Sequence, residues 1–132
     1  MLQTCNQCHS INFARAEMEK GDDLIEAGDA LLAAAIRVIV ELYQDGVLEK
    51  PDSYIYEFPD LLMFNDAPTP IERTLFNMHL KHRMRLFQGA FHSNPDYALW
   101  YGWSEMVQDL AEIEDLAAGL RREAPKGWWP FK

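Results

Sequence analysis

Residues 99–120 carry apolar side chains at alternating steps of four and three residues, and this repeat constrains the fold more than any other feature. The positions are Leu99, Trp103, Met106, Leu110, Ile113, Ala117 and Leu120. Such a heptad seam is typical of helices that pack in bundles or coiled coils. It predicts a helix over 95–123, with Asn94 as its N-cap and Pro125 beyond its end.

A second long helix is predicted over 69–92 from its N-terminal signature. Thr69 is placed to cap the helix, Pro70 suits its first position, and Glu72 completes a capping box. Its expected apolar stripe consists of Phe76, Leu80, Met84, Phe87 and Phe91.

Two neighbouring apolar stripes predict a third long helix over 23–44, which the pair Asp45–Gly46 ends. Gly21 suits a C-terminal cap in the left-handed conformation. We therefore expect a short separate helix over 11–20 in front of the long one.

Three prolines exclude a long helix between about 47 and 68, where "SYIYEF" (53–58) alternates like a short strand. The sequence thus predicts an all-α, single-domain helical bundle with three long helices, one short N-terminal helix and an irregular crossover. We expect the bundle domain over 1–124 and an aromatic tail over 125–132.

The chain is acidic, with 12 Lys and Arg against 21 Asp and Glu and a net charge of −9. This charge argues against direct binding of nucleic acid, because phosphate contacts need clustered Lys and Arg. No apolar run approaches the roughly 20 residues that span a bilayer. The N-terminal residues do not resemble an export signal, so the sequence predicts a cytoplasmic protein with reduced thiols.

Cys5, Cys8 and His9 form a C-x-x-C-H segment, which is the spacing of c-type haem attachment and of half a zinc site. Haem attachment is disfavoured by the expected cytoplasmic location. A single structural zinc is preferred to haem, with His79 and His82 as the remaining ligands. The favoured interpretation is that no cofactor binds: the two thiols hold nothing, and His79 and His82 are boundary histidines that are hydrogen-bonded to carboxylates.

Acidic side chains recur at helical spacing in residues 105–115, where the seam places Glu105, Asp109 and Glu112 on the outer face. In size and helix count the chain resembles the all-α nucleotide pyrophosphohydrolases. That resemblance implies a metal-dependent nucleotide hydrolase. No recognised catalytic motif is present, so a non-enzymatic protein is preferred.

The preferred function is binding of a protein partner that has a basic, nucleic-acid-binding surface. The candidate contact residues are Asp22, Asp23, Glu26, Asp29, Glu105, Asp109, Glu112, Trp128, Trp129 and Phe131. In size, acidity and absence of a catalytic motif the chain resembles small inhibitors encoded by phages and plasmids, such as anti-CRISPR proteins. The alternatives are a zinc-stabilised helical adaptor and the hydrolase. A homodimer is left open.

Overall fold

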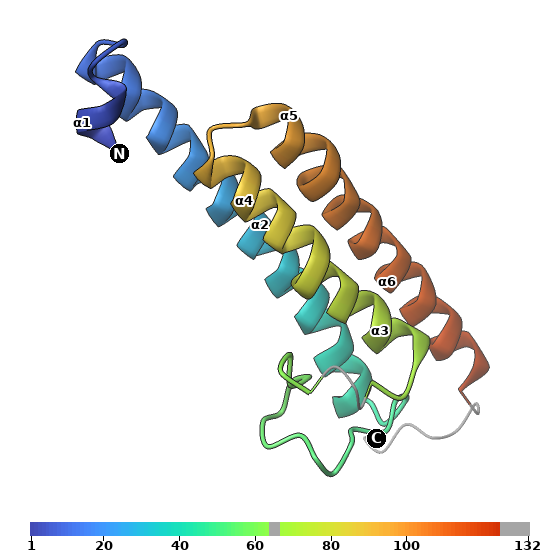
Figure 1. The fold of residues 1–132 in the computed structure, drawn as a ribbon. Coiled ribbons are helices and arrows are strands. Elements are labelled where there is room, and N and C mark those ends of the chain that lie inside the picture. The colour runs from blue at the N-terminus through green and yellow to red at the C-terminus, as the bar shows by residue number, and fades with distance from the viewer. Residues whose placement is uncertain (64–66, 125–132) are drawn as a thin grey trace.

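The computed structural model describes residues 1–63 and 67–124 as three long helical rods with a short helix at the N-terminus (Figure 1). The short helix is α1 (Leu2–Cys5), and the first rod is α2 (Ile11–Gln44). The second rod joins α3 (Pro70–Asn77), a π-helical segment η2 (Met78–Arg83) and α4 (Met84–Phe91). The third joins α5 (Pro95–Ala98), the π-helical η3 (Leu99–Trp103) and α6 (Ser104–Glu123). The predicted all-α helical bundle is confirmed.

The expected break at Gly21 is wrong, because α2 continues through it for 34 residues. In the described chain the glycine with a positive φ is Gly46, at 66°, which follows the end of α2. Gly21 instead lies where α4 reaches α2, and a Cβ there would stand 3.3 Å from the Ala90 carbonyl oxygen. The short N-terminal helix occurs at 2–5 rather than over 11–20.

The start of the second rod forms as predicted. Pro70 occupies the first turn, and the Thr69 N–H donates to Glu72 Oε2 at 3.2 Å. Thr69 Oγ1 also donates to this oxygen at 2.6 Å, and the Tyr43 hydroxyl donates to Glu72 Oε1. Glu72 is fully buried, and these three donors satisfy its carboxylate.

The apolar stripe expected on the second rod is wrong. Four of its members are between 39% and 51% exposed: Leu80, Met84, Phe87 and Phe91. The rod buries the neighbouring face instead, with Leu75, His82 and Leu86. The physical reason is a close backbone contact with the third rod, where a Cβ on Gly89 would lie 2.5 Å from the Ala98 nitrogen.

The heptad seam holds in α6, where Met106, Ile113 and Ala117 are at most 1% exposed. It shifts by one residue at the N-terminal end of the third rod. There Ala98 is buried and Leu99 is 45% exposed. The π-helical turn of η3 accounts for this shift, because it adds a residue to one turn of the helix.

The expected strand in the crossover does not form, since no strand occurs in residues 1–63 or 67–124. Tyr54 is buried, while Ile55 and Tyr56 are exposed. The Lys50 ammonium donates to the carbonyls of Tyr54 and Tyr56 at 3.1 and 3.2 Å, so a side chain rather than a neighbouring strand bonds these groups.

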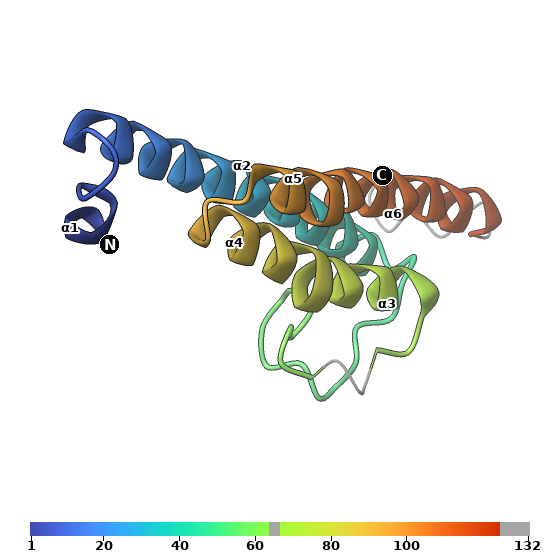
Figure 2. The ribbon, with the colours of Figure 1, turned by 45° about the horizontal axis from the view of Figure 1, so that its top comes forward.

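The N-terminal part of α2 extends beyond the ends of α4 and α5, and α1 lies beside it (Figures 1 and 2). The bundle begins near Glu17, which lines a pocket together with Gly89 of α4 and Ala98 of α5. The first six residues of α2 (11–16), together with α1, therefore form a projection from the bundle.

We predict that Gly102→Ala destabilises the protein, because a Cβ there would lie 2.5 Å from the Leu86 backbone nitrogen. Overpacking of this kind costs about 1–3 kcal/mol of unfolding free energy. Gly119→Ala is the matched control, because its nearest neighbour would be an Arg122 side-chain nitrogen at 3.9 Å. The control should gain up to about 1 kcal/mol from helix propensity. Equal urea midpoints for the two variants would contradict this packing.

Candidate functional site

The C-x-x-C-H segment forms a single helical turn at the tip of the projection. Cys5 is the last residue of α1. Its carbonyl accepts hydrogen bonds from the amides of Cys8 at 3.1 Å and of His9 at 2.9 Å. Both cysteines are free thiols, with Cys8 exposed and Cys5 partly exposed. The turn therefore presents two accessible sulfur nucleophiles and, directly after them, an exposed imidazole.

This turn leads into α2 through a capped junction. Ser10 is the N-cap, and its hydroxyl accepts from the Phe13 amide at 3.2 Å. The His9 ring lies against the Phe13 ring, with centroids 5.1 Å apart and planes at 34°. Because the cap satisfies an end amide of α2, the segment joins the long helix without a flexible spacer.

The segment that carries the thiols exposes both apolar and polar side chains and contains no acidic residue. Met1, Ile11 and Phe13 are 58%, 36% and 50% exposed. Residues 1–16 contain no Asp or Glu and one basic residue, Arg15, although the chain carries −9 overall. An acidic ligand would therefore meet no like charge from residues 1–16.

The zinc site predicted from Cys5, Cys8, His9, His79 and His82 does not assemble in the described residues. No group of three or more His, Cys, Asp or Glu is placed to hold a metal ion in residues 1–63 and 67–124. His79 and His82 belong to η2, within the bundle, whereas the cysteines lie on the projection. The structure does not bring the two pairs together.

His82 instead bonds a carboxylate, as the favoured interpretation of the two histidines predicts. Its Nδ1 lies 2.5 Å from Asp109 Oδ2, and both residues are 7% exposed. The prediction that Asp109 faces outward is therefore wrong, because His82 draws it into the helix interface. Burial raises the pKa of the Asp109 carboxyl, and the hydrogen bond from His82 opposes that rise.

The other predicted contact residues are separated over the surface. Asp22, Asp23 and Glu26 are exposed on α2, near the point where the projection begins. Asp29 is exposed but accepts two hydrogen bonds from Arg83, at 2.5 and 3.1 Å, so the bundle neutralises its charge. Glu105 is partly exposed. Trp128, Trp129 and Phe131 lie outside the described residues.

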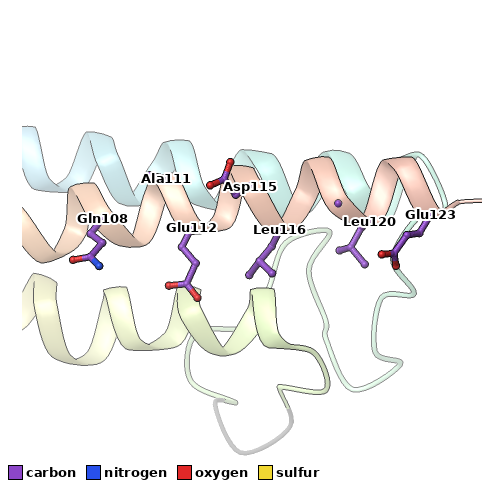
Figure 3. Close-up of a pocket in the computed structure, with 8 residues that line it drawn as sticks. Gln108, Ala111, Glu112, Asp115, Leu116, Leu120 and Glu123 are labelled. Carbon is purple, nitrogen blue, oxygen red and sulfur yellow. The ribbon is translucent and has the colours of Figure 1, made fainter.

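Glu112 lines a shallow groove of about 610 Å³ along α6 (Figure 3). The groove is also lined by Asp115, Leu116, Leu120 and Glu123. In Figure 3 Glu112 and Asp115 point in different directions, so these two carboxylates do not converge on one ion.

One protein-family model matches this chain, over residues 1–53, and its description is a seven-times multi-haem cytochrome CxxCH. The match covers less than half of the 132 residues. This chain has two cysteines and therefore one such motif. A search of curated proteins gives no significant match. No helix in the described residues is long and apolar enough to cross a membrane.

Sequence reasoning found the thiol segment but missed two features around it. One is the contact of His9 with Phe13, which the spacing of four residues could have indicated. The other is the continuity of α2 with this segment, which was missed because Gly21 was expected to end a helix.

We predict that His79 makes stability fall in mild acid. Its Nδ1 is buried without a hydrogen-bond partner among the described residues, and burial lowers the pKa of the imidazole, with nearby Arg83 adding to the effect. A lowered pKa disfavours the proton in the folded state. The associated stability is present above the ordinary histidine pKa of about 6.5 and is lost as the pH falls through the lowered value.

The measurement is the urea midpoint of wild type and His79→Gln between about pH 8 and pH 4. Because glutamine does not titrate, the midpoint of wild type should fall more than that of the variant as the medium is acidified. Parallel curves would show that His79 is not responsible.

Proposed function

We propose that the projection carries one c-type haem, which Cys5 and Cys8 would bind covalently and whose iron the His9 imidazole would ligate. The observation that carries the proposal is the arrangement of two accessible free thiols and an exposed histidine on one helical turn. The match of residues 1–53 to a multi-haem CxxCH family supports it. This role ranks above zinc binding, for which the described residues supply no ligand set.

The chemistry of the residues fits this group. Cys5 and Cys8 would hold the haem by thioether bonds, each thiol giving its sulfur to one vinyl carbon and its hydrogen to the other. The addition consumes no oxidant, but it requires reduced thiols, and both cysteines are free. The exposed apolar residues Met1 and Ile11 supply surface for a macrocycle to cover. A bound haem would supply one-electron redox chemistry, which the side chains of this chain lack.

The bundle acts as a rigid support for this group. The projection joins α2 without a break, and α2 is held in the bundle by α4 and α6. The proposal therefore assigns electron transfer or haem binding to the tip of the molecule and a scaffolding role to the three rods.

Binding of a basic protein partner stays a prediction. The exposed carboxylates Asp22, Asp23 and Glu26 favour it, and their place beside the projection would let them steer a basic redox partner toward the haem. The inhibitor role has no further support. The expected cytoplasmic location fits the zinc alternative, whereas the haem proposal requires a compartment with machinery for c-type haem attachment.

The test is to produce the full chain behind a secretion leader in a bacterium that attaches c-type haem. Wild type should retain one haem per chain after denaturation, because thioether bonds survive unfolding. The double variant Cys5→Ser/Cys8→Ser should retain none. His9→Ala should change the visible absorption spectrum of the haem, whereas the control His92→Ala should not. His92 is also exposed and also contacts a phenylalanine ring, that of Phe91 at 5.4 Å.

Two results would contradict the proposal. One is wild-type protein that carries no covalent haem under these conditions. The other is stoichiometric zinc that depends on Cys5 and Cys8 in the same preparation.

A further inference from the structure

We propose that Phe13 is a positioning residue that fixes the orientation of the His9 imidazole for ligation of the haem iron. This inference rests on the haem site proposed above and deepens it. The observation that carries it is the contact of the two rings, with centroids 5.1 Å apart and planes at 34°. Aromatic pairs at such separations attract each other beyond the burial of their surface.

A ligating histidine usually has its second ring nitrogen held by a carboxylate or a carbonyl, which sets the plane of the ring. His9 has no such partner among the described residues, and residues 1–16 contain no acidic side chain. Without another contact the exposed imidazole would rotate about its own side-chain bonds. The Phe13 ring restricts that rotation by contact with one face of the imidazole.

Phe13 can do this because its own backbone is fixed. It is the third residue of α2, and its amide donates to the hydroxyl of the N-cap Ser10 at 3.2 Å. The bond uses the main chain of Phe13, so a change of its side chain leaves the cap intact. The ring is nevertheless 50% exposed. Because the ring is half exposed, packing of the core does not explain a phenylalanine here. Its contact with the candidate iron ligand does.

The experiment compares wild type with Phe13→Leu, which keeps an apolar side chain and removes the ring. Phe13→Tyr is the conservative variant that restores the ring. Phe91→Ala is the matched control, because Phe91 is 51% exposed and also contacts a histidine, His92, but on α4. Covalent haem content, helical content and the change of the haem absorption spectrum on acidification are measured for each protein.

We expect equal haem and helix contents in all four proteins. The pH midpoint at which acid releases the His9 imidazole should rise in Phe13→Leu. Loss of the attraction between the two rings should weaken the ligation by His9 roughly three- to tenfold. Phe13→Tyr and Phe91→Ala should both have the same pH midpoint as wild type. A purely structural role of Phe13 would lower helix content and leave this midpoint in place.

A second measurement needs no haem. In the haem-free chain the Phe13 ring should shift the proton resonances of the His9 imidazole, and Phe13→Leu should abolish that shift. Haem-loaded proteins with identical acid midpoints would overturn the positioning role and leave the haem site standing. Wild type without covalent haem would overturn both, even with the ring-current shift present.

Discussion

The continuity of α2 is the constraint on which the rest of the structure depends. This helix runs from Ile11 to Gln44, which gives it a length of about 50 Å at 1.5 Å per residue. Both glycines within it face the second rod, where Gly28 lies against the Leu86 side chain and Gly21 against the Ala90 backbone. They let the rod approach closely, so the same residues that weaken a helix locally hold this one in the bundle. The projection is helical because α2 does not end where the bundle does.

Local signals in the sequence were sufficient for most helix ends. The capping box at Thr69, the Asn94 cap and the stop at Gly46 depend on residues within a few positions of one another. Such signals act through nearby backbone groups, so the sequence alone can show them. The all-α bundle followed from these ends together with the seam of residues 99–120.

The faces that become buried could not be predicted in the same way. Two apolar stripes run along residues 71–91, and the choice between them depends on Gly89 and Gly102, which touch another rod through its backbone. The π-helical turns of η2 and η3 add to the difficulty, because a constant period of 3.6 residues does not continue through them. Burial of Asp109 follows from its pairing with His82, a partner 27 residues away. The candidate site could also be predicted only in part. Its residues are adjacent in sequence, but the choice between haem and zinc depended on whether the distant histidines reach the two cysteines.

The central claim is that one haem is held at the tip of an unbroken helix, clear of the bundle. The most direct measurement is the distance between the haem iron and a nitroxide attached to Gln44→Cys, by pulsed electron spin resonance. Thioether bonds would occupy Cys5 and Cys8, so the introduced thiol would be the one available for labelling. The account predicts about 50 Å, which is the rise of the helix from His9 to residue 44. A distance of about 35 Å or less, the span from Gly21 to residue 44, would contradict it, as would protein with no haem iron to detect.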